Sequence, residues 1–287
     1  MNLTVNLGKT KNEEPFSIDF IMDDIGLVLL SGQTCTGKSV LHNHIYKQLV
    51  QQNSFEEIGF LLLDATRVDF TNWSGQYLVS DVLTDMEDSI VALENLAERD
   101  IDPKKHIFVH IEECDIFYGE EGRTEKAIFT IREKKPNVHI IYSTSRPGEK
   151  EVSDELLNRF DLKILFHMSP NPAIRLMGND LANEQEAGYK IIALKDRQYI
   201  SIPLSEEQAK EANEFRKNGP PITVYKINDT ERYLADFKNR LKKEMGIKCP
   251  CNDTSCAECL VSKCTEDNCP VHFMRKKLEF RGQDKNE

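Results

Sequence analysis

The feature that most constrains this chain is the stretch GQTCTGKS at residues 32–39, where Lys38 and Ser39 follow the second of two glycines. An apolar run at residues 27–30 precedes it, and an amphipathic stretch at residues 40–50 follows it. The pattern G-x-x-x-x-G-K-[ST] between a strand and a helix is typical of a loop that binds a polyphosphate. The chain is therefore expected to fold around such a loop, unless this is a glycine turn with an incidental lysine.

Each part of this loop has a physical role in phosphate binding. The glycines let several backbone N–H groups point at phosphate oxygens, and a helix beginning there adds the positive end of its dipole. Lys38 is placed to reach the β- and γ-phosphates of ATP, and Ser39 to hold Mg²⁺ through its hydroxyl. Cys35 is interpreted as a small filler, with a redox switch as the alternative. The predicted nucleotide-binding residues are Gly32, Gln33, Thr34, Cys35, Thr36, Gly37, Lys38, Ser39 and Val40.

Length and composition limit the class of protein. The 287 residues are 39% hydrophobic and 30% charged, which indicates a soluble globular chain with one large or two modest domains. No apolar run approaches the roughly 20 residues of a membrane span, and no signal peptide opens the chain, so a cytoplasmic location is expected. The net charge of −11 argues against a broad basic surface that coats nucleic acid, but it is compatible with a locally basic channel.

Short apolar runs alternate with helical patterns along most of the chain. This alternation predicts an α/β fold with a mainly parallel sheet covered by helices on both faces. A hairpin at the start and a closing antiparallel pair are also expected. The predicted strands span residues 25–30, 58–63, 107–111, 138–142, 162–166, 189–194 and 199–202, and the predicted helices span residues 40–52, 85–99, 125–134, 154–159, 205–218 and 229–245.

Two acidic residues, Glu112 and Glu113, end the apolar strand in the stretch HIFVHIEEC. The carboxyl ends of parallel strands face the ligand crevice, so a phosphate-binding loop after one strand needs acidic partners after a neighbouring strand. We assign Glu112 to the Mg²⁺ shell and Glu113 to the attacking water. The alternative is that two glutamates simply end a strand at the surface.

A third predicted site follows the strand in the stretch IIYSTSRP, which ends in hydroxyl residues. Thr144, with Ser143 and Ser145, could hydrogen-bond the γ-phosphate or the water, and the alternative is an ordinary turn before a proline. Three arginines could neutralise charge in a transition state, although for each of them a surface salt bridge is the favoured interpretation: Arg146, Arg159 and Arg175.

The end of the chain changes character, because six of the eight cysteines lie within residues 249–269. Thiolates and an imidazole at short spacing suit tetrahedral Zn²⁺, and metal would stabilise a segment with little apolar content. A disordered cysteine tail and an iron–sulfur site are the alternatives. The predicted zinc ligands are Cys249, Cys251, Cys256, Cys259, Cys264, Cys269 and His272.

These segments, in this order, resemble the FtsK/SpoIIIE branch of the FtsK–HerA ATPases over roughly residues 7–194. The loop strand LVLLSGQTCTGKSVLHNHI resembles the family's nucleotide loop, and IFVHIEECDIF resembles its Walker B strand. LLLDATRVDF is similar to the family's segment after the second strand, with Asp64 and Asp69 in corresponding positions. NVHIIYSTSRP is similar to a later family stretch, and Gly188 stands where the family has its late glycine.

The resemblance implies a RecA-like P-loop motor that assembles as a homo-oligomeric ring, usually a hexamer, and translocates double-stranded DNA at the cost of ATP. It implies an ATPase core at residues 1–204. The residue pattern then predicts a helical extension at residues 205–246 and a cysteine-rich zinc-binding module with a charged tail at residues 247–287. The chain would then be a compact motor that transfers, segregates or packages DNA.

Several positions depart from the family pattern. Glu112 stands at the Walker B aspartate position, one methylene longer, and Ser145 replaces a glutamine. Lys134 replaces an arginine, and a lysine lacks the bidentate fork. Two alternatives therefore stay open: a protein-secretion ATPase of the same fold, and a catalytically impaired nucleotide-binding subunit.

Overall fold

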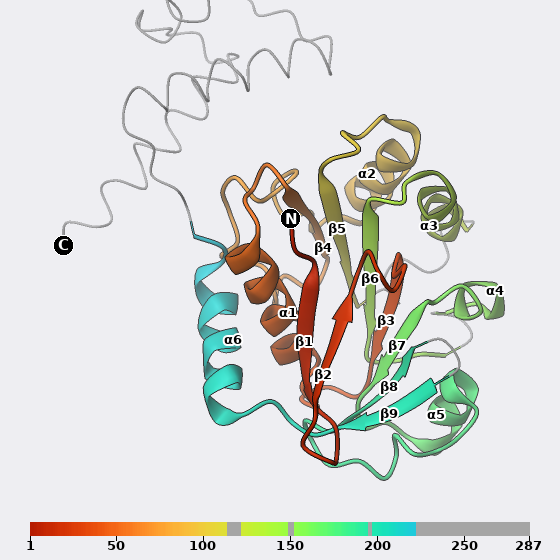
Figure 1. The fold of residues 1–287 in the computed structure, drawn as a ribbon. Helices are drawn as coiled ribbons and strands as arrows, with labels where there is room; N and C mark the ends of the chain where they lie inside the picture. The colour runs from red at the N-terminus through yellow and green to blue at the C-terminus, as the bar shows by residue number, and fades with distance from the viewer. Residues whose placement is uncertain (114–121, 149–151, 195–196, 222–287) are drawn as a thin grey trace, which may run out of the picture. The chain divides into compact units, whose positions relative to one another are not determined.

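The computed structural model describes residues 1–113, 122–148, 152–194 and 197–221 (Figure 1). These residues belong to one compact unit, Met1–Ile222. The predicted helix at residues 229–245 and the cysteine-rich segment at residues 247–287 lie outside the described residues, and the predicted domain boundaries stay predictions. None of the helices in the described ranges has the length and apolar character that crossing a bilayer requires.

The described part of the chain contains a seven-stranded sheet with the order β4-β5-β6-β3-β7-β8-β9. The first five strands in this order are parallel, and β8 and β9 extend the sheet as an antiparallel pair. The mainly parallel α/β sheet predicted from the sequence is therefore confirmed. The strands are β3 (Leu27–Ser31), β4 (Ile58–Asp64), β5 (His106–Glu112), β6 (Val138–Thr144), β7 (Leu162–Leu165), β8 (Lys190–Leu194) and β9 (Arg197–Ser201).

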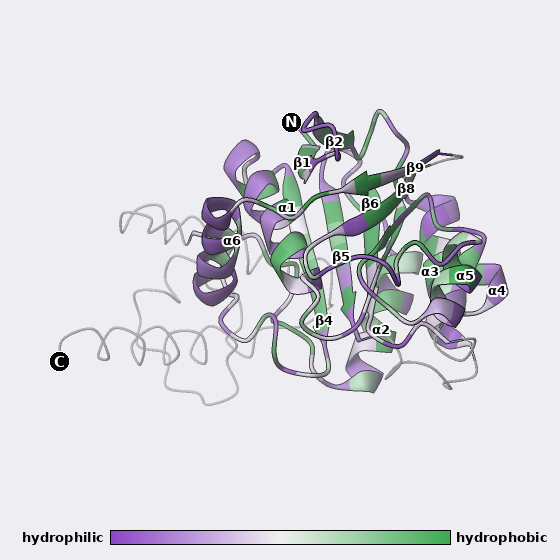
Figure 2. Cartoon of the chain, turned by 90° about the horizontal axis from the view of Figure 1, so that it is seen from below, coloured by the Kyte–Doolittle hydropathy of each residue, from purple (hydrophilic) through white to green (hydrophobic). Residues whose placement is uncertain are grey.

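Helices cover both faces of the sheet, because side chains alternate between the two faces along each strand. Leu27 and Leu29 belong to a core on the face covered by α2, α3, α4 and α5, whereas Val28 and Leu30 belong to a core shared with α1. Figure 2 shows the apolar colouring along the strands and the polar colouring of α6. The helices are α1 (Lys38–Gln52), α2 (Met86–Glu98), α3 (Arg123–Lys134), α4 (Asp154–Leu157), α5 (Pro170–Met177) and α6 (Glu206–Asn218).

The predicted hairpin is confirmed as β1 (Thr4–Lys9) paired antiparallel with β2 (Pro15–Asp19). Its apolar residues, such as Leu7 and Phe20, join the core on the α1 face of the sheet. Helix α5 was not expected from the sequence, because its first turn contains two prolines. Proline is tolerated in the first turn because its missing N–H has no partner there in any case, but it resembles loop sequence.

One expectation about the topology was wrong. The acidic pair was placed after a strand adjacent to β3, but β6 lies between β3 and β5. Three strand ends therefore meet in a row at one edge of the sheet, with Ser31 of β3 paired with Thr144 of β6, and Ile111 of β5 paired with Tyr142. The extra strand brings the hydroxyl residues of β6 between the glycine loop and the acids.

Candidate nucleotide-binding site

The loop between β3 and α1 has the backbone conformation that its glycines permit. Gly32 has φ 154° and Gly37, the residue before α1, has φ 115°. A Cβ at position 32 would lie 2.6 Å from the Cβ of Phe166, so only glycine fits between the loop and β7. Cys35 also takes a left-handed conformation, with φ 65°, and its side chain is exposed. The loop is thus tightly turned, with its rim open to solvent.

Two backbone hydrogen bonds fix this loop against the rest of the unit. The N–H of Gln33 donates to the carbonyl of His167, and the N–H of Gly188 donates to the carbonyl of Thr36, both at 2.9 Å. Gly188, the late glycine of the resemblance, therefore contacts the loop directly. Both contacts involve residues that follow β7 in the sequence, so this later part of the unit helps to fix the conformation of the loop.

Lys38 is the first residue of α1, and its side chain is buried. Its Nζ donates to the carbonyl of Gly32 at 2.7 Å and to that of Gln33 at 3.3 Å. The ammonium group is thus held over the loop by the carbonyls of the loop itself. Because the first turn of α1 contains no acidic residue, the positive end of its dipole is not neutralised from within the helix. This arrangement can attract and hold an anion.

Ser39 points at a carboxylate that the sequence analysis did not assign to the site. Its Oγ donates to Asp69 Oδ2 at 3.3 Å, and Arg216 of α6 forms an ion pair with Asp69 Oδ1 at 2.6 Å. Burial, and then the charge of Glu112, raises the pKa of Asp69 to about 6, although Arg216 opposes this. Asp69 could have been assigned to the site from the family segment that contains it, whereas no sequence pattern indicated Arg216.

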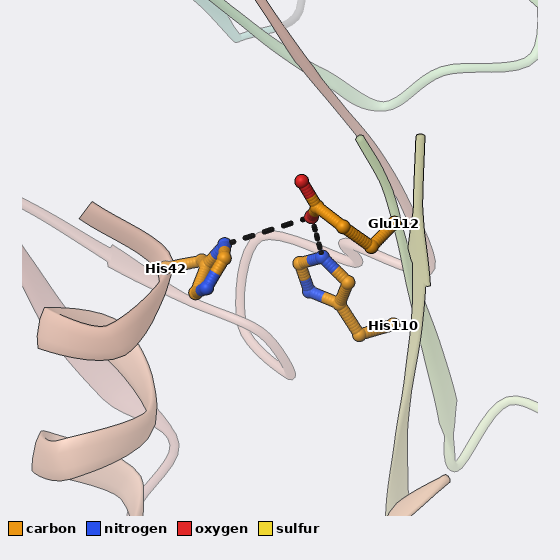
Figure 3. Close-up of side chains that lie close together, drawn as sticks. All are labelled: His42, His110 and Glu112. Atoms are coloured by element: carbon orange, nitrogen blue, oxygen red, sulfur yellow. Dashed lines mark hydrogen bonds and ion pairs between the residues drawn. The ribbon is translucent and has the colours of Figure 1, made fainter. Parts of the chain in front are cut away.

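Glu112 lies at the end of β5 and is buried. It accepts a hydrogen bond from Nε2 of His110 at 2.6 Å (Figure 3). Nδ1 of His110 lies 2.5 Å from the hydroxyl of Tyr46. Since a carboxylate can only accept, His110 carries its proton on Nε2 and accepts from Tyr46. Burial, and then the charge of Glu112, raises the pKa of Tyr46 well above its ordinary value. The Glu112 carboxylate is thus oriented by His110, and His110 is oriented in turn by Tyr46.

Glu113 turns away from Glu112. Its backbone is left-handed, with φ 50°, and its carboxylate accepts from the hydroxyl of Ser145 at 2.7 and 2.6 Å and from the N–H of Ser145 at 3.1 Å. Thr144 is buried, and its Oγ1 accepts from the N–H of Arg146 at 3.1 Å. The two acids therefore do not contact the same partners: Glu112 faces α1, and Glu113 faces the end of β6.

Two of the candidate arginines are engaged away from the loop. Arg159 pairs with Glu155 at 3.0 Å, and its guanidinium lies 4.0 Å from the ring centre of Phe129. Arg175 pairs with Asp154 at 2.7 Å. These contacts match the surface salt bridges that were the favoured interpretation, and the exposed Arg146 stays a candidate.

The structure thus brings the sequence-predicted residues to one edge of the sheet. The glycine loop, Lys38 and Ser39 come from the end of β3, and the acids and Thr144 come from the ends of β5 and β6. The seven predicted zinc ligands, from Cys249 to His272, lie outside the described residues, and their role stays a prediction.

Comparisons with known proteins bear out the resemblance to FtsK. No family model matches the chain. It is 25% identical over 264 residues to the DNA translocase FtsK of Leptospira interrogans, covering 78% of this chain and 28% of the relative. It is 30% identical over 93 residues to the DNA translocase FtsK of Shewanella oneidensis, covering 32% of this chain and 10% of the relative. The chain therefore spans 28% or less of the length of these curated relatives.

Solved structures show the same fold at low sequence identity. The conjugation coupling protein TcpA of pCW3, in its monomer form with ATPγS, matches with a TM-score of 0.58 and 15% identity, over 76% of this chain and 71% of that one. The Type VII secretion ATPase EccC of Thermomonospora curvata matches with a TM-score of 0.57 and 16% identity, over 71% of this chain and 28% of that one. This likeness shows that the chain shares the α/β fold of these two proteins.

Proposed function

We propose that this chain is an ATP-hydrolysing motor of the FtsK/HerA type that translocates double-stranded DNA. The observation that carries the proposal is the glycine loop at residues 32–39 with a buried Lys38, placed at the same sheet edge as Glu112 and Glu113. The sequence likeness to DNA translocases supports the choice of DNA as the substrate that moves. The whole activity, the substrate and the partners are part of this proposal.

ATP would bind with its phosphates against the loop. Backbone N–H groups of the loop and the N-terminus of α1 would bind the phosphate oxygens. The Lys38 ammonium would exchange the carbonyls of Gly32 and Gln33 for β- and γ-phosphate oxygens. This exchange requires little movement of the backbone, because the ammonium group already lies over the loop. Lys38 would then balance the charge that develops on the transferred phosphoryl group.

The residues present fit Mg²⁺, which prefers oxygen ligands. Ser39 offers a hydroxyl, and Glu112 offers a carboxylate at the end of β5, on the same edge of the sheet. The Asp69 carboxylate lies 3.3 Å from the Ser39 hydroxyl. Mg²⁺ supplies charge neutralisation of the phosphates when it is bound. Ser39 and Glu112 would hold it, and Tyr46 and His110 would keep the Glu112 carboxylate oriented.

Glu113 would orient and polarise the attacking water. Its hydrogen bonds to Ser145 hold the carboxylate at the end of β6, next to the buried Thr144. Thr144 would then sense whether the γ-phosphate is still present. In this assignment, β6 would link Glu113 to the glycine loop, because β6 lies between β5 and β3 in the sheet.

We further propose that the motor works as a homo-oligomeric ring, with a hexamer as the expected form, in the cytoplasm. An arginine from a neighbouring subunit would complete each site, and basic side chains in the pore would contact DNA phosphates. The cysteine-rich segment would bind Zn²⁺ through its own ligands. The secretion-ATPase alternative is not favoured, because the curated sequence relatives are DNA translocases and the likeness to EccC concerns the fold.

The test is the rate of ATP hydrolysis by the full chain with and without double-stranded DNA. We expect hydrolysis that depends on Mg²⁺ and rises when DNA is added. Lys38→Ala should abolish it, whereas Lys47→Ala should retain it, because Lys47 lies on the same helix but pairs with Glu211 of α6. Absence of hydrolysis in the wild type, or equal rates in the two variants, would refute the proposal.

A further inference from the structure

A cluster of three buried side chains lies directly beside the proposed Mg²⁺ position. His42 of α1, His110 of β5 and Glu112 at the end of β5 each offer one ligand atom, and these atoms all lie within 4.8 Å of one another (Figure 3). Nε2 of His110 lies 2.6 Å from Glu112 Oε2, and Nδ1 of His42 lies 4.0 Å from the same oxygen. The rings of the two histidines lie 4.5 Å apart. Two elements of the fold thus converge on one point.

His42 is the unexplained member of this cluster. Its side chain is completely buried, and neither ring nitrogen has a hydrogen-bond partner within the described residues. Buried polar atoms in folded proteins almost always have partners, because an unpaired group loses its hydration without compensation. Stacking against Phe70 and Tyr46 accounts for the ring's position but not for its nitrogens. A ligand that accepts a nitrogen lone pair would compensate this cost.

We propose that His42, His110 and Glu112 form a binding site for a divalent transition-metal ion of the Zn²⁺ class. Two imidazoles and one carboxylate are a known ligand set for Zn²⁺, with a fourth position left open to solvent or substrate. Mg²⁺ and Ca²⁺ prefer oxygen ligands, so nitrogen atoms from two histidines select against them. This site is distinct from the cysteine-rich segment, which offers mainly thiolates.

The surrounding residues fit the outer shell of a metal site. Metal-binding histidines usually donate their other ring N–H to an oxygen, which fixes the ring. Nδ1 of His110 already faces the hydroxyl of Tyr46 at 2.5 Å, so a shift of the proton from Nε2 to Nδ1 would free Nε2 for a metal and keep this hydrogen bond. The Tyr46 oxygen would then accept instead of donate, which a phenol can do.

The site has a consequence that rests on the proposed function. His42 lies three residues after Ser39 on α1, so both side chains leave the same face of the helix. Glu112 is assigned to both sites, and its Oε2 already lies within the histidine cluster, so an ion bound there competes with Mg²⁺ for this carboxylate. A transition-metal ion at His42 and His110 would therefore take Glu112 from Mg²⁺ and lower ATP hydrolysis, and metal availability would regulate the motor.

The experiment measures zinc binding to the full chain without nucleotide, so its outcome does not depend on ATPase activity. The chain is unfolded with urea at several Zn²⁺ concentrations, and the transition is followed by the fluorescence of Trp73. This is the one tryptophan in the sequence, and it is buried in the described unit, so the cysteine-rich segment does not dominate the signal. Zn²⁺ should raise the midpoint of this transition in the wild type. No change of the midpoint with Zn²⁺ in the wild type would overturn the proposal.

The matched variants separate this site from zinc bound elsewhere. His42→Leu should abolish the zinc-dependent rise and lower the zinc bound at equilibrium by one ion per chain. His44→Leu, also a buried histidine of α1, should keep both, because His44 is not part of the cluster. If His42→Leu loses its cooperative transition, Glu112→Gln gives the same comparison with nearly unchanged volume. Zinc binding by His42→Leu and Glu112→Gln that equals that of the wild type would also overturn the proposal.

Discussion

The pair formed by His106 and His139 predicts a specific loss of stability in mild acid. Nδ1 of His139 lies 2.6 Å from the carbonyl of Ile25, and its Nε2 lies 2.8 Å from Nδ1 of His106. A carbonyl can only accept, so His139 donates through Nδ1 and accepts from His106 through Nε2. A proton added to Nε2 of His139 would place two N–H groups against each other. Both histidines are therefore expected to be neutral in the folded chain.

The size of the effect follows from the pKa of His139. Burial is the largest cause, and it lowers this pKa from 6.5 to about 4. A folded-state pKa below the unfolded value contributes stability above the unfolded pKa, and this stability is lost as the pH falls toward the folded pKa. This stability is therefore lost between about pH 6.5 and about pH 4. The side chain is 2% exposed, so solvent screening is small. When the pH falls from about 7 to about 5, protonation linked to His139 should lower the free energy of unfolding by about 2 kcal/mol.

The assay is urea unfolding at both pH values, followed by Trp73 fluorescence. His139→Gln removes the titrating group and keeps a side-chain N–H, so the fall in free energy between the two pH values should be about 2 kcal/mol smaller than in the wild type. Ile128→Val is the control: it removes one buried methyl group and should cost about 1 kcal/mol at both pH values. If His139→Gln and the wild type show equal falls, the neutral pair is wrong.

Three further predictions concern the site and the end of the chain. Glu113→Gln should bind ATP as the wild type does but fail to hydrolyse it, as measured by retained radiolabelled ATP, and loss of affinity would contradict its assigned role. Arg216→Ala should cost about 1–3 kcal/mol of unfolding free energy at neutral pH, because it leaves the buried Asp69 carboxylate without its partner, and unchanged urea unfolding would refute this. The purified full chain should contain about one or two Zn²⁺ in the cysteine-rich segment at residues 249–272, and chelation should remove a melting transition, whereas a metal-free chain would refute zinc binding by this segment.

Much of the fold could be predicted from the sequence, because the apolar runs and helical spacings are local patterns. Every predicted strand has a counterpart, and Gly32 and Gly37 mark the loop correctly. The strand order could not be predicted in this way, since nothing in the runs themselves says that β6 separates β3 from β5. Helix α5 was missed because its prolines resemble a loop, although they occupy the first turn.

The motif residues of the candidate site could be identified along the sequence, but their contacts in the fold could not. Lys38, Ser39 and Glu112 follow from motifs. The contacts around them do not, because they come from distant segments: Asp69, which accepts from Ser39, lies beyond β4, and Arg216, which pairs with Asp69, lies on α6. The histidine beside Glu112 sits two positions before it on the same strand, where alternation puts both side chains on one face. That spacing was visible in the stretch HIEE, but only the fold adds His42 from α1.

The most direct test of the central claim is the binding of Mg·ATPγS to the full chain, measured by calorimetry in the wild type and in Lys38→Ala. We expect one nucleotide per chain in the wild type. In Lys38→Ala the affinity should be about 10- to 100-fold lower, since hydrogen bonds to a charged group contribute about 1.5–3 kcal/mol. Equal affinity in the two proteins, or no binding to the wild type, would show that the loop at residues 32–39 does not hold a triphosphate.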